Sequence, residues 1–341
     1  MTDCHRLRRD MSMNKRIDTI DILKGITIIL VVFGHAVQGI VDSNNLSLNT
    51  DFSSIYITKK IIYGFHMPVF FIVSGFFLTK WLKKDKPTAL KKKTKRLVYP
   101  YFVWSFITAL FMQIASKFTN NGLGLIDFVK SPVIPFSQYW FLYLLFFFHL
   151  VYFVVDIFFN KKSLNVLFCI SIGLFCIGPF LPDVWVMSNF TKYFIFFMLG
   201  SYVLPYIQKE KKVGVTALLG MILLFIVVNY LYVSVLEMKY VRYYLFFITS
   251  IVGFILSLSL SIYISQKFSK LKGFMIYLGK NSMQLYVMHL IPLAGLRIVL
   301  LKLIPSINLW GLSLLIAFLS LIICLIGIKI INKLNLEKIL F

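Results

Sequence analysis

A long apolar stretch near the C-terminus occupies residues 309–331 and reads LWGLSLLIAFLSLIICLIGIKII. Its only charged residue is Lys329, close to its end. A hydrocarbon core about 30 Å thick is crossed by about 20 residues of helix. The stretch therefore predicts a transmembrane helix.

The same pattern recurs along the rest of the chain. Comparable apolar stretches occupy residues 22–41, 61–79, 97–116, 139–159, 164–181, 192–207, 213–233, 243–265 and 274–297. The 341 residues are 59% hydrophobic and 14% charged, whereas soluble proteins are about 45–50% apolar and about 25% charged. We predict an all-α fold, a polytopic membrane helix bundle of about ten transmembrane helices.

The charge of the chain is strongly positive, at +23. Lys and Arg concentrate in the N-terminal tail and in alternate loops, above all in 80–96. Such alternation is typical of cytoplasmic loops in a membrane protein, so we expect both termini in the cytoplasm. The positive charge then reflects the position of these loops at a lipid bilayer, and we do not expect nucleic acid as a partner. We divide it into a cytoplasmic tail over 1–21, a transmembrane domain over 22–331 and a second cytoplasmic tail over 332–341.

The four cysteines predict no disulfide. Cys4 lies in the tail, whereas Cys169, Cys176 and Cys324 lie inside apolar runs with no C-x-x-C spacing. We interpret these three as small buried hydrophobic residues and expect no cysteine metal site.

The first predicted span contains the most polar residues. Lys24 and His35 are eleven residues apart, which places them about 20° from the same helical face and about 16 Å apart along the axis. Asp21 lies close to that face, and Gly25 and Gly34 flank the pair. Ionisable residues in a membrane are candidates for function. The alternative is that Lys24 reaches toward the headgroups and His35 makes a packing hydrogen bond.

The second predicted span opens with Phe65-His66-Met67-Pro68. His66 is expected at a depth similar to that of His35, and Pro68 removes one backbone hydrogen bond and can open the helix. Two histidines could ligate a metal, but no third ligand appears at a suitable depth. We therefore predict no metal site.

Two further segments contribute candidates. Arg96 closes a basic loop just before a helix start that Pro100 marks, where a guanidinium could bind a phosphate. In the ninth predicted span, Ser282, Tyr286 and His289 are spaced four and three apart and form one polar stripe. A hydrogen-bonded seam between helices would explain that stripe equally well. His149 lies alone in a Phe-rich run, and we interpret it as structural.

In this combination and order, the motifs resemble the acyltransferase-3 family of integral membrane acyltransferases, and within it the fucose 4-O-acetylase-like proteins. The residues that carry the resemblance are Arg16-x-Asp18-x-x-Asp21-x-x-Lys24-Gly25 with Gly34-His35, Phe65-His66-Met67-Pro68 with Ser74-Gly75, Arg96 with Pro100-Tyr101, Tyr139-Trp140-Phe141-Leu142, and Leu278-Gly279-x-Asn281-Ser282 with Tyr286 and His289. About ten spans also resemble that family's architecture.

The resemblance implies O-acyl transfer, usually of acetyl, from cytoplasmic acyl-CoA to a sugar hydroxyl of a cell-surface polysaccharide or glycolipid precursor. It makes His35 the catalytic residue, either as a general base or as a transient acyl carrier. CoA phosphates would bind Lys24, Arg96 and Arg16. Family members commonly have Arg at the position of Lys24, and Lys supplies charge without the planar fork.

The remaining candidates have supporting roles. Asp21 would hold Lys24, whereas His66, Asn281, Ser282 and His289 would orient the acceptor or stabilise the oxyanion. No cofactor is expected to stay bound, because acetyl-CoA is a substrate. Partner candidates are glycan-assembly proteins or a second copy of the chain.

Two other functions compete with this interpretation. A transporter or flippase of a glycan or lipid precursor would line its path with the same polar residues, but it predicts internal symmetry that the chain lacks. A purely structural membrane partner gives no reason for Lys24 and His35 to share a face. We expect a multi-pass protein of the cell membrane, a bacterial plasma membrane.

Overall fold

The computed structural model describes residues 2–43, 52–78, 86–115, 123–159, 162–207, 212–304 and 308–341, without the side chains of 2–17, 86, 205 and 206. Within these ranges the regular elements are all helical, as predicted. They are α1 (Thr2–Val41), α2 (Phe52–Tyr63), α3 (His66–Gly75), α5 (Lys86–Ile114), α6 (Leu125–Lys130), η2 (Ser137–Tyr139), α7 (Trp140–Phe159), α8 (Ser163–Ile177), η4 (Gly178–Phe180), α9 (Trp185–Ile207), α10 (Val215–Ser234), α11 (Lys239–Lys267), α12 (Ser269–Lys280), α13 (Ser282–Met288), α14 (Leu290–Leu303), α15 (Leu309–Lys333) and α16 (Glu337–Leu340).

The described residues contain seven helical segments that are long and apolar enough to cross a membrane, or eight if the bent pair α13 and α14 counts as one span. The seven are Asp18–Val41, Pro87–Ile114, Ser137–Phe159, Ser163–Phe180, Val215–Ser234, Lys239–Lys267 and Leu309–Lys333. The chain is therefore a multi-pass membrane protein. The predicted number of ten spans is not confirmed, and the location of the termini remains a prediction.

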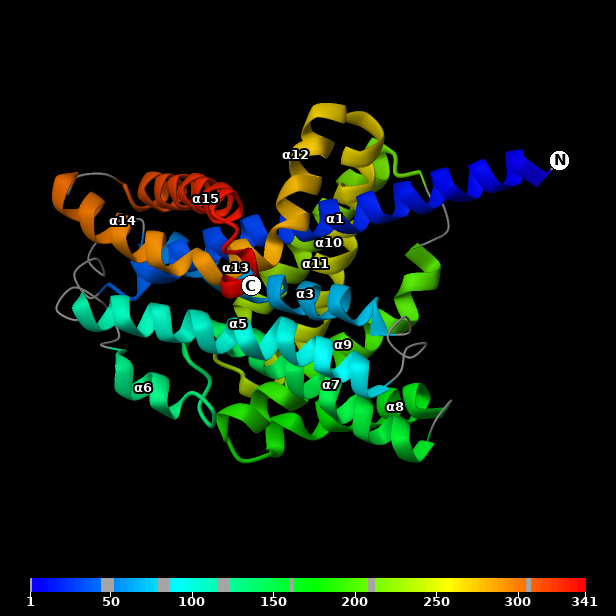
Figure 1. The fold of residues 1–341 in the computed structure, drawn as a ribbon, viewed down its shortest axis with the longest axis horizontal. Coiled ribbons are helices and arrows are strands. Elements are labelled where there is room, and N and C mark those ends of the chain that lie inside the picture. The colour runs from blue at the N-terminus through cyan, green and yellow to red at the C-terminus, as the bar shows by residue number, and fades with distance from the viewer. Residues whose placement is uncertain are drawn as a thin grey trace.

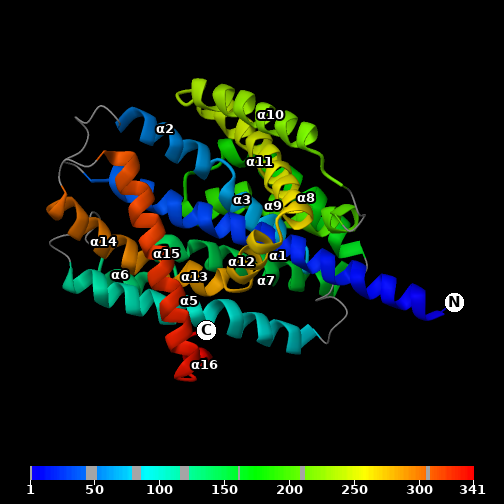
Figure 2. The ribbon, with the colours of Figure 1, turned by 90° about the horizontal axis from the view of Figure 1, so that it is seen from above.

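Helix α1 lies at the centre of the bundle, although its N-terminal part projects beyond the other helices (Figures 1 and 2). It contacts α2, α3, α11, α12, α13, α14 and α15. Its approach to α12 depends on Gly279, because a Cβ built there would lie 1.8 Å from the backbone oxygen of Asp21. A helix that is surrounded in this way holds its polar side chains inside the protein, away from lipid.

Two predicted spans are broken and not continuous. Within the predicted span 61–79, α2 ends at Tyr63 and α3 begins at His66. Pro68 has no N–H to donate to the Gly64 carbonyl, and the Ser250 hydroxyl donates to that carbonyl instead, at 2.9 Å. The predicted span 274–297 is divided among α12, α13 and α14, with a bend of 48° between the last two.

The bend in the second of these spans has a local cause. Pro292 lies in the first turn of α14, so the carbonyl of Met288 loses its helical donor. His289 occupies the break, and its carbonyl accepts a hydrogen bond from the Ser320 hydroxyl at 3.3 Å. At the first break a serine thus replaces the lost donor, whereas at the second Ser320 bonds the neighbouring carbonyl of His289, which also accepts from the Leu293 N–H at 3.1 Å.

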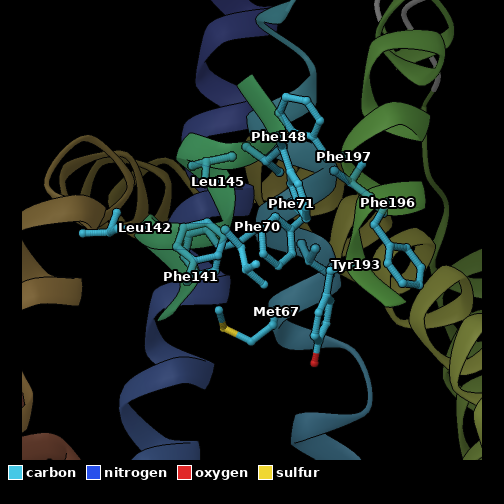
Figure 3. Close-up of a cluster of buried hydrophobic side chains, with 14 of the residues drawn as sticks. Met67, Phe70, Phe71, Phe141, Leu142, Leu145, Phe148, Tyr193, Phe196 and Phe197 are labelled. Carbon is cyan, nitrogen blue, oxygen red and sulfur yellow. The ribbon is translucent and has the colours of Figure 1, made fainter. Parts of the chain in front are cut away.

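The core is built largely from aromatic rings. Phe71 of α3 lies among Phe141 and Phe148 of α7 and Tyr193 of α9, with ring centroids 4.7–5.2 Å apart (Figure 3). Rings at such spacings attract one another beyond simple area burial. This cluster fixes α3 against α7 and α9, and α3 begins at the histidine of the second predicted span.

Two sequence interpretations are wrong in detail. Helix α5 begins at Lys86 and runs through Pro100, so Arg96 lies inside a helix and not before its start. Cys169 and Cys176 are exposed, whereas Cys324 is buried, and all three are free. An apolar run does not distinguish a side chain that faces the protein core from one that faces lipid, since both surroundings are apolar.

Candidate active site

His35 of α1 lies within a cluster of aromatic and imidazole rings. Its Nδ1 atom is 3.0 Å from the hydroxyl of Tyr63, the last residue of α2. Its ring centroid is 5.1 Å from that of His289. Tyr63 also packs edge-on against His66, at 4.8 Å between centroids. Tyr63, which the sequence did not single out, therefore lies between His35 and His66, and His289 contacts His35 directly.

The two partner histidines are buried and have defined tautomers. His66 and His289 are both 0% exposed. In each ring Nδ1–H donates to a backbone carbonyl, that of Ile62 at 2.6 Å and that of Tyr286 at 2.6 Å. Each Nε2 atom then carries a lone pair, and neither has a hydrogen-bond partner among the described residues. Within the same residues, no group of three His, Cys, Asp or Glu side chains could hold a metal ion.

His35 lines a cavity of about 310 Å³ that we name the histidine pocket. Its lining comprises His35, Ala36, Gln38, Gly39, Asp42, Tyr63, Met112, Leu123, Ser137, Gln138, Trp140, Leu290, Leu293, Ala294, Arg297 and Ile316. Such a lining, mostly apolar with a few convergent polar groups, is typical of a small-molecule site. Residues 123, 137 and 138 come from the connection that precedes α7.

A second cavity of about 280 Å³ holds four cations, and we name it the basic pocket. They come from three elements and are Lys24, Lys93, Arg96 and Lys280. Ser74, Ser282 and His149 also line it. Lys24 forms an ion pair with Asp21 at 2.5 Å, and no carboxylate is among the described lining residues. The pocket therefore offers a concentrated positive charge with hydroxyl groups beside it, which suits an anion.

Hydrogen bonds of two tyrosines connect the linings of the two pockets. Tyr286 lines the basic pocket, and its hydroxyl donates to the carbonyl of Gln138, which lines the histidine pocket. In return the Tyr139 hydroxyl donates to the carbonyl of Val287 at 2.8 Å. The Tyr286 ring also contacts His289, at 5.9 Å between centroids. Tyr286 therefore links the linings of the two pockets and lies beside His289.

The structure brings together most of the predicted site residues, although in two groups. One group holds His35 with His289 beside it and His66 linked to it through Tyr63. In the other, Lys24, Arg96 and Ser282 line the basic pocket, with Asp21 beside Lys24. Asn281 lies outside both pockets, and its side chain donates to the Tyr277 carbonyl at 2.8 Å between α12 and α13. The side chain of Arg16 lies outside the described residues.

Sequence reasoning missed several lining residues. Lys93 was one of many lysines in a basic loop, and His149 was interpreted as structural although it lines the basic pocket. Tyr63 and Arg297 fall near the ends of predicted spans, where aromatic and cationic residues are common because they lie at the membrane–water interface. The spacing of Leu293 and Arg297, one turn apart on α14, is the signal that could have placed Arg297 on an inward face.

The chain is similar in sequence to known proteins. Two curated relatives are both named nodulation protein NolL. The one from Sinorhizobium fredii is 33% identical over 135 residues, which are 38% of this chain and 34% of that protein. The one from Mesorhizobium japonicum is 27% identical over 190 residues, 55% of this chain and 48% of that protein. These matches thus span at most about half the length of either relative.

No solved structure matches the chain. The profile of the acyltransferase-3 family, described as an acyltransferase domain, matches residues 17–329. That range contains both pockets and every predicted site residue except Arg16. Because the match covers most of the sequence, the chain belongs to the acyltransferase-3 family.

Proposed function

We propose that this protein is a membrane O-acyltransferase that moves an acyl group, acetyl by default, from acyl-CoA to a sugar hydroxyl of a cell-envelope polysaccharide or glycolipid precursor. The observation that carries the proposal is the pair of pockets on one helix face. Lys24 in the basic pocket and His35 in the histidine pocket are about 16 Å apart along α1. We expect the donor in the basic pocket and the acceptor in the histidine pocket, with Tyr286 linking the two linings.

The basic pocket suits the donor. Acyl-CoA presents phosphates, and Lys24, Lys93, Arg96 and Lys280 supply the charge to bind them. A cavity of about 280 Å³ holds only part of a molecule the size of CoA, so the remainder would extend from the opening. The lysine-rich stretch of α5 before Arg96 is consistent with a cytoplasmic opening.

His35 would activate the acceptor. When its Nδ1–H donates to the Tyr63 oxygen, Nε2 holds the lone pair that can take a proton from the sugar hydroxyl. The sugar oxygen then attacks the thioester carbonyl, the C–S bond breaks, and the proton passes from the imidazole to the departing thiolate. His289, beside His35, is a candidate to orient the acceptor, because its Nε2 lone pair can accept a hydrogen bond from a sugar hydroxyl.

The test is acyl transfer from radiolabelled acetyl-CoA to envelope glycan, in membranes that contain the wild-type protein or His35→Ala at equal folded abundance. The matched control is Asn229→Ala, which removes a buried polar side chain of α10 outside both pockets and should leave labelling unchanged. We expect labelled glycan with the wild type and none with His35→Ala. Equal labelling by the wild type and His35→Ala would contradict the role of His35.

A further inference from the structure

Arg297 places a buried positive charge in the histidine pocket. It lies on α14, it is 7% exposed, and it lines the cavity together with Leu290, Leu293 and Ala294. These residues follow the i, i+3, i+4 and i+7 spacing of a single helical face. The side chain is therefore aimed into the pocket by the helix that follows the break at His289.

The guanidinium has few partners for its five N–H donors. One nitrogen donates to the Gly39 carbonyl at 2.8 Å. Among the described residues it forms no ion pair, and the one carboxylate that lines the pocket with it is that of Asp42. That carboxylate is engaged elsewhere, by Lys59 at 3.5 Å and by a hydrogen bond from the Gln38 amide.

A buried charge with incomplete pairing is costly to maintain. In a membrane protein, such a charge lining a cavity marks a candidate binding site. Arg297 and Lys59 supply two positive charges against the single negative charge of Asp42, so the cluster keeps one excess positive charge. An anionic ligand in the pocket would balance it.

The position of this charge relative to His35 is set by α1. Gly39, which accepts from Arg297, follows His35 by four residues on the same helix, about 6 Å along the axis. That distance is close to the width of one sugar ring. An anion bound by Arg297 would therefore lie on the same sugar as the reactive hydroxyl or on its neighbour.

We propose that the histidine pocket selects an acceptor that carries an oxyanion, either a carboxylate or a phosphate ester, within about one sugar ring of the acylated hydroxyl, and that Arg297 binds it. The proposal rests on the proposed function, because it names the substrate class of the same site. Arg297 is then a specificity-determining residue, since its fork can bind an oxyanion in bidentate fashion.

The experiment uses the purified full chain in detergent and isothermal titration calorimetry. The carboxylate arm compares methyl glucuronide with its neutral methyl ester, and the phosphate arm compares glucose 1-phosphate with methyl glucoside. Wild-type protein is expected to bind one of the anions at least about tenfold more tightly than its neutral counterpart, the ratio that one charge-assisted hydrogen bond gives. The arm that shows the preference identifies the kind of oxyanion.

Variants separate charge from packing. Arg297→Gln should abolish the preference, Arg297→Lys should retain part of it, and the exposed control Lys130→Gln should retain all of it. Equal binding of anionic and neutral probes, no binding of any probe, or an unchanged preference in Arg297→Gln would each overturn the proposal. His35→Ala should keep the preference while losing acyl transfer. If the wild type shows the preference but transfers no acyl group, the proposed function fails and the anion site stands.

Discussion

Removal of one hydroxyl tests how His35 is held. Tyr63→Phe deletes the group that lies 3.0 Å from His35 Nδ1 and keeps the ring that packs against His35 and His66. A buried polar atom left without its partner costs about 1–3 kcal/mol. Because this bond is only partly buried and borders a cavity, we expect the lower part of that range, about 1–2 kcal/mol, or roughly a 5- to 30-fold loss of kcat.

The assay is steady-state acyl transfer by the purified protein, with acyl-CoA and acceptor varied separately. The KM for acyl-CoA should stay unchanged, because Tyr63 does not line the basic pocket. The matched control is Tyr143→Phe, whose hydroxyl donates to the Pro132 carbonyl at an exposed site, with an expected change of about twofold or less. An unchanged kcat in Tyr63→Phe would refute the view that this hydroxyl orients the imidazole. A raised KM with an unchanged kcat would assign Tyr63 to substrate binding.

Two further predictions concern the basic pocket and the central helix. Lys24→Ala should raise the KM for acyl-CoA about 10- to 150-fold through loss of a charge-assisted contact of about 1.5–3 kcal/mol, and Lys24→Arg should retain most of the affinity. Lys329→Ala, outside both pockets, should leave the same steady-state constants unchanged. Equal effects of the two alanine variants would contradict a donor site in the basic pocket. Gly279→Ala should destabilise the bundle by about 1–3 kcal/mol, because the new methyl group would overlap the Asp21 carbonyl. The control is Gly273→Ala, where nothing lies within 4 Å of the new methyl group, and it should be neutral or slightly stabilising. Thermal unfolding in detergent measures the stability of both variants. Equal shifts of their unfolding temperatures would contradict the close approach of α1 and α12.

The helices of the bundle could be predicted from the sequence, but the breaks within them could be predicted only in part. Apolar runs of about 20 residues predict membrane helices directly, and the runs at 22–41 and 309–331 lie inside α1 and α15. Pro68 signalled an opening in the helix. Pro292 gives the same signal three residues after His289, where the segment bends, but the polar stripe of that segment favoured one continuous helix. The hydroxyls that stabilise these breaks, from Ser250 and Ser320, are distant in sequence.

The candidate site could be predicted only where its residues share one element. Lys24 and His35 lie on one helix, so their spacing predicted a common face and a separation in depth. The Tyr63 hydroxyl reaches His35 from the end of α2, and the four cations of the basic pocket come from three elements, so only tertiary packing brings them together. His149 lies in a run of phenylalanines, a pattern typical of packing, and nothing in that pattern reveals a neighbouring cavity.

The central claim is that a donor in the basic pocket and an acceptor in the histidine pocket meet at His35. The most direct measurement uses the purified protein in sealed vesicles, with molecules of one orientation selected by labelling. Labelled acetyl-CoA is supplied on the side of the basic pocket and acceptor glycan on the other side. We predict O-acyl glycan on the acceptor side with the wild type and none with His35→Gln. Label transfer that is independent of His35, or that requires donor and acceptor on the same side, would contradict the claim.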